Sequence, residues 1–359
     1  MACKLLHINS ADFDKFEQTP EYMTRPRIVK IYDINYTRFT PAKKLSYLFK
    51  TPNLSEYPLD ISSDLGTPIE LKYSTQTGLL NPLLHTYFGC DENENDLDDS
   101  CVNRKNNHNK NVEMIDVYSR RGALEKIMAF CYDKNDFGIL VSRYNGKIFM
   151  IERPKNEETF EKEQTGNTHH RRLIQITSVA VTPDESNGND DNIFQTAVYE
   201  ANLAKYNLHY GGRTQFIKIA DESKNNLSDM NKIDHVAVKQ MWSTIRDKNI
   251  KLLRYWLQGY LANVRELYLA YKDQRGIVQS PMECYKSCEI PKKCYWKPSV
   301  CTTFLNVFLD KVEDVMTNVD SVDIVYEFQF HGLNKIVQYT KRSGIGFIPK
   351  EYADKIKEL

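Results

Sequence analysis

Two short segments, Leu208–Gln215 and His235–Lys239, have the residue alternation of two adjacent strands. Adjacent strands that present carboxylates and a lysine on one face can hold two divalent cations for phosphodiester hydrolysis. The lysine is present as Lys239. The other alternating positions hold Arg213, Gln215 and Ala237. None of these three side chains supplies the anionic oxygen that a hard divalent cation needs, so the pattern predicts a nuclease-like site without its metal ligands.

The composition limits the class of protein. The chain has 359 residues, of which 41% are hydrophobic and 11% aromatic, enough to bury a large core. Its formal net charge is zero, which argues against attachment to nucleic acid or membrane by bulk charge but leaves room for a local basic groove. The N-terminal residues lack the apolar segment of a signal peptide, and no later apolar run is long enough to span a bilayer. We therefore expect a soluble intracellular protein.

The chain contains eight cysteines, which raises the question of disulfides or zinc. Four of them, Cys284, Cys288, Cys294 and Cys301, are close in sequence, but they do not form the paired C-x2-C knuckles of common zinc sites. An intracellular protein keeps its thiols reduced, and Cys301 begins an apolar segment with the pattern of a buried helix. We therefore expect reduced, partly buried thiols, with structural zinc as the alternative.

Three polar segments interrupt the apolar pattern, at residues 91–111, 182–192 and 222–234. They are poor in apolar residues or rich in turn formers, so we interpret them as loops or disordered insertions. No internal repeat is visible, and none of the breaks separates two self-sufficient apolar blocks. The sequence therefore predicts a single domain over residues 1–359 with long surface loops.

Between these loops the pattern predicts mainly strands with a few helices. Phe137–Tyr144 and Lys147–Glu152 flank Asn145-Gly146, a dipeptide that tolerates the positive φ angles of a type I′ hairpin turn. Arg120–Met128 predicts a short helix. Trp242–Val264 predicts a longer helix, because its apolar residues recur at helical spacing.

A strand over Glu266–Tyr271 and a turn over Asp273–Gly276 follow this long helix. The order of strand, helix and strand is typical of a mixed core. We therefore predict a mixed α+β fold with two twisted mixed β-sheets flanked by helices.

Several segments stand in an order and spacing that are specific to one family. They are Ile245–Tyr260, Tyr268–Val278 and Trp296–Cys301, with further support from Phe194–Gln215 and Met114–Glu152. Together they resemble the DXO family of decapping enzymes and 5′–3′ exoribonucleases. The resemblance covers most of the chain beyond residue 110 and implies the DXO-like nuclease fold.

The resemblance also implies where the site should lie. Members of the DXO family bind two divalent metals through a glutamate after a Gly-x-x-x-Glu strand, a Glu-x-Asp pair and a Glu-x-Lys pair, and an upstream arginine contacts RNA. Arg121 matches that arginine. The carboxylate positions fall on Ala180 or Val181, on Arg213 and Gln215, and on Ala237, with Lys239 as the matching lysine. A different register, with Asp221 at the aspartate position, would restore at most one ligand.

Loss of these carboxylates implies an inactive protein that binds no metal and no other cofactor. The departure resembles that of a catalytically inactive insect germline member of the family. That resemblance implies a nuclear protein at chromatin, which acts in piRNA-cluster transcription with the adaptors Rhino and Deadlock. Its role would be to protect nascent transcripts from 5′-end processing, splicing and termination.

The vestigial site supplies three cations, Arg121, Arg213 and Lys239, that could hold an RNA 5′ end without cutting it. Two alternatives remain open. The first is a metal-dependent decapping enzyme or 5′–3′ exoribonuclease with an atypical site that uses Asp221 or a nearby acid. The second is a structural adaptor that does not touch RNA.

Other candidate features favour less specific interpretations. His169-His170 beside Arg171-Arg172 is a possible metal or phosphate site, but the polar context favours solvated surface. Gly344-Ile345-Gly346 favours a turn before Phe347. The predicted helix over 242–264 has a basic face, which a solvated amphipathic surface explains more simply than an RNA contact. That face comprises Arg246, Lys248, Lys251 and Arg254.

Overall fold

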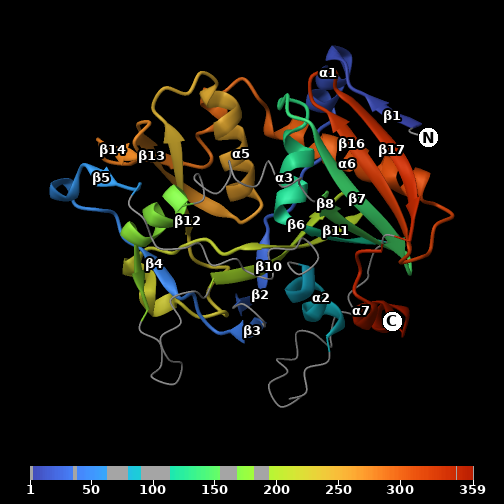
Figure 1. The fold of residues 1–359 in the computed structure, drawn as a ribbon, viewed down its shortest axis with the longest axis horizontal. Coiled ribbons are helices and arrows are strands. Elements are labelled where there is room, and N and C mark those ends of the chain that lie inside the picture. Colours follow the sequence, from blue (N-terminus) through green and yellow to red (C-terminus); the bar gives the residue numbers. More distant parts are fainter. Residues whose placement is uncertain are drawn as a thin grey trace.

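A mixed ten-stranded sheet is the largest element of the fold (Figure 1). The computed structural model describes residues 3–34, 39–62, 80–89, 114–153, 168–181, 194–344 and 346–358. In spatial order the strands are β1 (Cys3–His7), β17 (Ile336–Ser343), β16 (Ile324–His331), β7 (Phe137–Tyr144), β8 (Lys147–Glu152), β6 (Ile115–Arg120), β11 (Tyr206–Arg213), β10 (Phe194–Leu203), β2 (Arg27–Ile34) and β3 (Phe39–Ala42). Strand β6 runs parallel to both of its neighbours, β8 and β11, whereas the other pairs are antiparallel.

A second, three-stranded sheet consists of β12 (His235–Trp242), β13 (Val264–Lys272) and β15 (Glu283–Lys286). Strands β12 and β13 are parallel and are joined by helix α5 (Lys248–Tyr260), which gives a strand-helix-strand unit. Two small ribbons pair β14 (Ile277–Val278) with β5 (Leu59–Asp60) and β4 (Tyr47–Phe49) with β9 (Ser178–Ala180). The predicted mixed fold with two sheets and flanking helices is confirmed.

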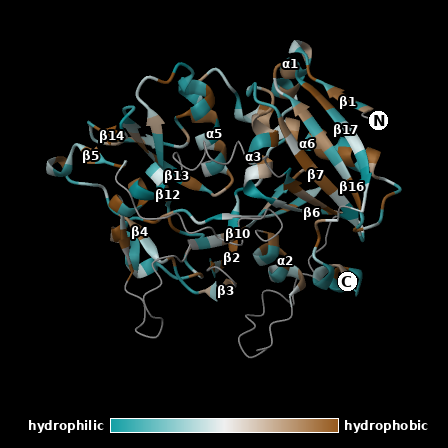
Figure 2. Cartoon of the chain, in the orientation of Figure 1, coloured by the Kyte–Doolittle hydropathy of each residue, from teal (hydrophilic) through white to brown (hydrophobic). Residues whose placement is uncertain are grey.

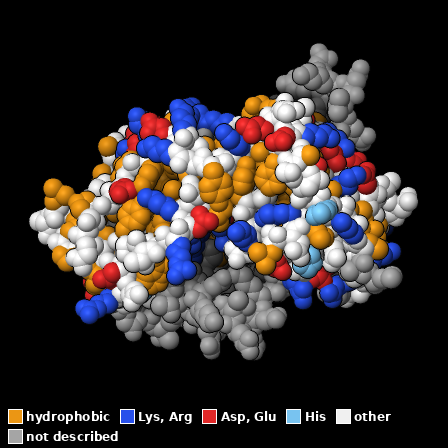
Figure 3. Space-filling model, turned by 90° about the horizontal axis from the view of Figure 1, so that it is seen from above, with side chains coloured by type: hydrophobic (Ala, Val, Ile, Leu, Met, Phe, Trp, Pro, Cys, Tyr) orange, Lys and Arg blue, Asp and Glu red, His pale blue; other side chains and the backbone are white. Residues whose placement is uncertain are grey.

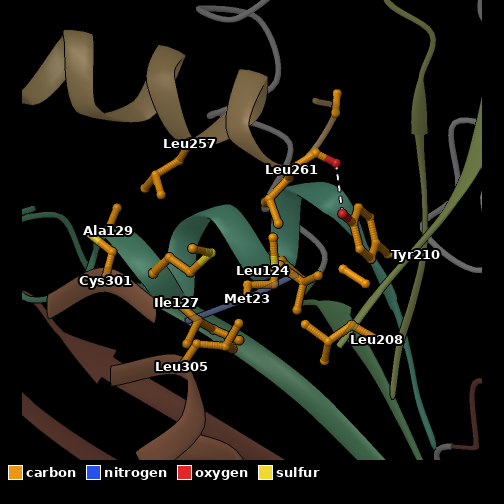
Figure 4. Packing of buried hydrophobic residues seen from close by; sticks show 14 of the residues in the cluster. Met23, Leu124, Ile127, Ala129, Leu208, Tyr210, Leu257, Leu261, Cys301 and Leu305 are labelled. Carbon is orange, nitrogen blue, oxygen red and sulfur yellow. Dashed lines mark hydrogen bonds between the residues drawn. The ribbon is translucent and has the colours of Figure 1, made fainter. Parts of the chain in front are cut away.

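Helices pack on both faces of the large sheet. On one face lie α1 (Ser10–Gln18), α3 (Arg121–Ala129) and α6 (Pro298–Val315), and on the other lie α2 (Asn81–Phe88) and α7 (Lys350–Glu358). Figure 4 shows Leu124 and Ile127 of α3 packed between Leu257 of α5 and Leu305 of α6. Short 3-10 turns are η1 (Leu54–Glu56), η6 (Ile219–Lys224) and η7 (Pro291–Lys293). Figure 2 shows that β16 and β17 carry both hydrophobic and hydrophilic residues, as strands with one buried face do.

The predicted hairpin and short helix are confirmed. Strands β7 and β8 pair across Asn145 and Gly146, whose φ angles are 48° and 71°, as a type I′ turn requires. Helix α3 begins one residue after the predicted start. Gly344, with φ of 76°, donates its N–H to the Asp323 carbonyl at 2.9 Å, which confirms a turn at this residue, while Ile345 lies outside the described residues.

The predicted start of the long helix is wrong. Trp242 is the last residue of β12, and α5 begins only at Lys248. The Asp247 side chain caps the helix by accepting a hydrogen bond from the Ile250 N–H at 3.2 Å. At the other end α5 stops at Tyr260, and Asn263, with φ of 53°, turns the chain into β13. The apolar residues at the end of β12 and those of α5 happen to share one helical period, which is why the sequence predicts a single longer helix.

Of the three predicted loops, only 222–234 lies in the described residues; 91–111 and 182–192 lie outside them. The segment 222–234 consists of turns, as predicted for a loop, but it packs on the core. Met230 and Ile233 are buried, and the Asn225 side chain bonds to both the N–H and the carbonyl of Leu45, at 2.8 and 2.9 Å. This loop is therefore an ordered part of the fold.

The cysteines in the described part of the chain have free thiols. Cys131 and Cys301 are buried against the helical core, whereas Cys284 and Cys288 are exposed. Within the same residues no three His, Cys, Asp or Glu side chains are grouped so that they could hold a metal ion. No helix among them is long and apolar enough to cross a membrane.

Candidate functional site

Three residues of the predicted site come together where β11, β12 and α3 meet. Arg121 is the first residue of α3, which directly follows β6, and Arg213 ends the neighbouring strand β11. The Arg121 Nη1 donates a hydrogen bond to the Arg213 carbonyl at 2.9 Å. Lys239 lies in β12, and both guanidinium groups lower its pKa. Arg121 and Arg213 are thus in contact, and Lys239 lies near enough to both for their charges to affect its pKa.

Lys239 is held by a hydrogen-bond chain to an acid. Its Nζ donates to the Gln258 Oε1 at 2.7 Å, and the Gln258 Nε2 donates to the Glu125 Oε2 at 3.2 Å. Glu125 is shared with Arg254, whose Nε lies 2.9 Å from the Glu125 Oε1. Burial is the main cause of a pKa of about 7 at Lys239; Arg121 and Arg213 also contribute to the lowering, and Glu125 opposes it. Lys239 therefore lies in a positive local field.

Arg213 combines two properties of a residue in a hollow. The residue is exposed to solvent, yet the pKa of its guanidinium is lowered, first by surrounding protein and then by Arg171 and Arg121. Exposure measures how much of the side chain water can reach, whereas the pKa depends on how much protein surrounds the charged group. A guanidinium that reaches water through a concavity is both exposed and largely surrounded by protein. Figure 3, in the view from above, shows Lys and Arg side chains on both sides of a central hollow.

The sequence analysis missed the contribution of residues 168–176, which form a helix. Burial, with contributions from Lys239 and Arg213, lowers the pKa of His170 to about 3, so His170 is a neutral member of the site. The prediction that this segment is solvated surface is wrong for His169, which is buried and bonds through Nδ1 to the Lys272 Nζ at 2.6 Å. The signal was the helical spacing of His169, Leu173 and Thr177, all of which are buried.

The positions matched to metal ligands do not fit two divalent cations. The Gln215 Nε2 donates to the carbonyls of Arg213 and Thr214, at 3.1 and 3.2 Å. Ala237 is buried in β12. Arg213 adds positive charge in place of an acid, and the part of the chain that the structure describes offers no ligand group in exchange. No metal-dependent step can be derived from these residues.

The remaining predicted ligand positions, Ala180, Val181 and Asp221, are not placed to bind a metal. Ala180 is the last residue of β9, and Val181 packs against the main core while its N–H donates to the Ser46 carbonyl at 2.9 Å. Asp221 lies in η6, where its Oδ1 is 3.0 Å from the Lys224 Nζ. The alternative register through Asp221 therefore begins from a carboxylate that already has a cationic partner.

The predicted basic face of the long helix is not a uniform solvated surface. Arg246 is exposed, but Arg254 binds Glu125. The Lys248 and Lys251 ammonium groups lie over tyrosine rings, 4.7 and 5.1 Å from the ring centroids. Only part of the face therefore matches the solvated interpretation.

We define the cation cluster by the positive side chains linked through these electrostatic effects. Its members are Arg121, Arg171, Arg213, Lys239 and Lys251. Burial first, and then positive neighbours in the cluster, lower the pKa of Arg213 and Lys239, with Glu125 opposing this at Lys239, so nearby positive charge disfavours the charged forms of these two side chains. An anion placed among them would relieve this repulsion, and guanidinium groups match the oxygens of a phosphate.

Comparisons with known proteins identify the family. A family model described as RAI1 like PD-(D/E)XK nuclease matches residues 31–353. The chain is 22% identical over 368 residues to Drosophila melanogaster "Decapping and exoribonuclease protein Rai1", covering 93% of this chain and 92% of that protein. It is 30% identical over 92 residues to Drosophila melanogaster "Protein cutoff", covering 24% of this chain and 23% of that protein.

Solved structures give the same fold. The Rai1 of Scheffersomyces stipitis, in complex with (3′-NADP)+ and calcium ion, superposes with a TM-score of 0.67 at 14% identity, covering 100% of this chain and 98% of the other. The Rai1 of Candida albicans, in complex with pU5-Mn2+, gives 0.66 at 13% identity, covering 100% and 99%. At this identity the likeness establishes the fold.

Proposed function

Because the chain belongs to the RAI1-like PD-(D/E)XK nuclease family, whose members act in RNA 5′-end metabolism, we propose that it is a non-catalytic member that holds RNA 5′ ends. The observation that carries the proposal is the cation cluster, in which Arg213 stands at a position where the family resemblance implies a metal ligand. Arg213, Gln215 and Ala237 replace three carboxylates, and Arg121 and Lys239 remain. Fixed positive charge therefore stands where active relatives would use bound metal.

The chemistry of the cluster favours a phosphate. Two divalent cations need several anionic oxygens to offset their dehydration, and these residues supply none. A 5′-terminal phosphate brings its own negative charge and accepts hydrogen bonds from guanidinium and ammonium groups. The protein would thus bind an RNA end that active relatives process, and leave it intact.

We further propose the cellular role that the resemblance implied. The protein would act in the nucleus, at chromatin, in a Rhino–Deadlock–Cutoff-type complex that protects nascent piRNA-cluster transcripts from 5′-end processing, splicing and termination. The support is the similarity of 92 residues to Protein cutoff together with the replaced carboxylates. Co-purification from nuclei tests this role: recovery of Rhino and Deadlock is expected, and their absence from a preparation that retains other nuclear partners would contradict it.

A binding titration tests the site itself. The triple variant Arg121→Ala, Arg213→Ala, Lys239→Ala is compared with wild type on 5′-phosphorylated single-stranded RNA at two salt concentrations. We expect weaker binding and a salt slope reduced by roughly two, because each lost phosphate contact on a single strand contributes about 0.7. The exposed Lys286→Ala of β15 is the matched control. An unchanged affinity and slope in the triple variant would reject the cluster as an RNA site.

An enzyme is the second candidate, because the chain is similar along nearly its whole length to a decapping and exoribonuclease protein. The two candidates differ in metal dependence. We expect no hydrolysis of capped, triphosphorylated or monophosphorylated RNA with Mn²⁺ or Mg²⁺, and Ala237→Glu alone should not create activity, since one carboxylate cannot assemble two metals. Turnover that is lost in Lys239→Ala would establish the enzyme.

A further inference from the structure

A row of lysine and tyrosine side chains follows one face of α5 and continues onto the neighbouring strands. Lys248, Lys251 and Tyr255 are three and four residues apart, so they lie above one another on the helix. Tyr271 of β13 and Tyr285 of β15 lie beside Lys248. We call these five residues the lysine–tyrosine stripe. All five are partly exposed, so they are ordered by packing and still meet solvent.

At one end, hydrogen bonds hold two rings in place. The Lys248 Nζ lies 4.7 Å from the centroid of the Tyr271 ring and donates to the Tyr285 hydroxyl at 3.3 Å. The two tyrosine hydroxyls are 3.2 Å apart, and the Tyr285 hydroxyl also donates to Glu283. Glu283, the acid among these contacts, is thus bound to the Tyr285 hydroxyl. A ring held in this way loses little conformational entropy when a ligand stacks on it.

At the other end, the stripe joins the cation cluster. The Lys251 Nζ lies 5.1 Å from the centroid of the Tyr255 ring, and the Lys239 Nζ lies 5.7 Å from the same centroid. The Tyr255 hydroxyl donates to the Gln240 carbonyl of β12, which fixes the position of the ring near both ammonium groups. Through the Tyr255 ring, Lys251 of the stripe and Lys239 of the cluster are neighbours, so the stripe adjoins the cluster.

We propose that the lysine–tyrosine stripe binds the single-stranded RNA that follows the terminal phosphate, with bases stacked on its tyrosine rings and backbone phosphates paired with Lys248 and Lys251. Alternating rings and cations suit a single strand, because every base has a stackable face and every linkage carries a charge. Bases within a duplex are already stacked and paired, so a duplex could not use the rings. The inference rests on the proposed function, which places the RNA 5′ end in the adjoining cluster.

Of the four basic residues predicted for this face, two belong to the stripe and two do not. Lys248 and Lys251 lie over tyrosine rings, whereas Arg254 is bound to Glu125 and Arg246 precedes the first residue of α5. Two of the four cations therefore belong to the RNA surface. Binding should be tolerant of sequence, because stacking and phosphate pairing do not read base edges.

The experiment compares two lengths of RNA by fluorescence anisotropy. A 5′-phosphorylated oligouridylate of about 12 nucleotides spans both the cluster and the stripe, whereas a phosphorylated dinucleotide reaches only the cluster. We expect Tyr271→Leu with Tyr285→Leu to weaken the long RNA about tenfold and to leave the dinucleotide unchanged. Lys248→Met should lower the salt slope for the long RNA by about 0.7. Tyr295→Leu, at a tyrosine that is 55% exposed and outside the stripe, is the matched control.

A second measurement uses only wild-type protein, so it does not depend on the folding of a variant. A phosphorylated abasic oligomer of the same length should bind about tenfold more weakly than oligouridylate. Equal binding of the two, or wild-type affinity of the tyrosine double variant, would overturn the stripe. Failure of the proposed function looks different: the long RNA would still depend on the stripe, while the triple cluster variant would leave dinucleotide binding unchanged.

Discussion

Lys239→Met should stabilise the protein at neutral pH, although it removes a hydrogen bond. A fall in pKa from 10.5 to about 7 corresponds to roughly 5 kcal/mol against the folded state whenever the lysine is charged. The side chain is only partly buried, so solvent screening reduces this penalty to about 2–3 kcal/mol. Loss of the 2.7 Å bond to Gln258 costs about 1 kcal/mol. The net gain in the free energy of unfolding is therefore about 1–2 kcal/mol near pH 7.

The stability difference between Lys239→Met and wild type should depend on pH in a definite direction. The folded pKa of Lys239 is depressed, so the unfolded chain binds more protons between about pH 7 and 10.5. The penalty is complete below pH 7 and disappears as the pH rises toward 10.5, where the lysine is neutral in both states. The difference between Lys239→Met and wild type should therefore shrink between pH 6.5 and 9.5.

Urea denaturation at these two pH values measures the difference, with Lys286→Met as an exposed control that should change stability by less than about 0.5 kcal/mol at both. If Lys239→Met destabilises the protein equally at both pH values, the argument is wrong. The ammonium would then be satisfied by Gln258 and Glu125, and its positive neighbours would be unimportant.

Three further predictions follow from individual contacts. A Cβ at Gly212 would lie 2.9 Å from the Arg121 Cβ and Nε, so Gly212→Ala should lower the unfolding free energy by about 1–3 kcal/mol and weaken RNA binding, measured by urea denaturation and anisotropy. Bound phosphate should raise the pKa of Lys239 from about 7, so binding near pH 7 should take up protons, which calorimetry in two buffers of different ionisation enthalpy detects. Burial alone would lower the pKa of His209, but hydrogen bonds to Asp116 and Glu200 raise it above its usual value. The protonated histidine therefore stabilises the fold, and His209→Gln should lower the unfolding free energy most below about pH 6.5. Denaturation at several pH values should show this loss disappearing as the pH rises through the folded pKa.

Local signals in the sequence predicted local structure well. The turn at Asn145-Gly146 depends on two residues that accept positive φ, and its register follows from the turn itself. The start of α5 was harder to predict, because the apolar residues at the end of β12 continue a helical pattern by chance. The decisive feature there is one capping carboxylate, Asp247, whose effect is shorter in range than the periodicity that hides it.

Contacts between distant segments could not be predicted in this way. His169 and Lys272 are separated by 103 positions, and their bond depends on how the helix at 168–176 packs beside β13. Composition therefore placed a buried histidine on the surface. The lysine–tyrosine stripe has the same origin, since Tyr271 and Tyr285 meet Lys248 only through the pairing of β13 with β15. By contrast, Arg121, Arg213 and Lys239 could be grouped in advance, because a family resemblance supplied the long-range information.

The emptied site has an electrostatic logic of its own. Several carboxylates held close together repel one another until metal binds, so replacing them with Arg213, Gln215 and Ala237 removes that repulsion. With a guanidinium at position 213, the repulsion at this site is instead between the positive charges of Arg121, Arg213 and Lys239. Under the proposed function, a bound anion would offset part of the penalty of about 2–3 kcal/mol at Lys239. Under the proposed function, these replacements make phosphate, rather than a divalent metal, the ligand that suits the charges of the site.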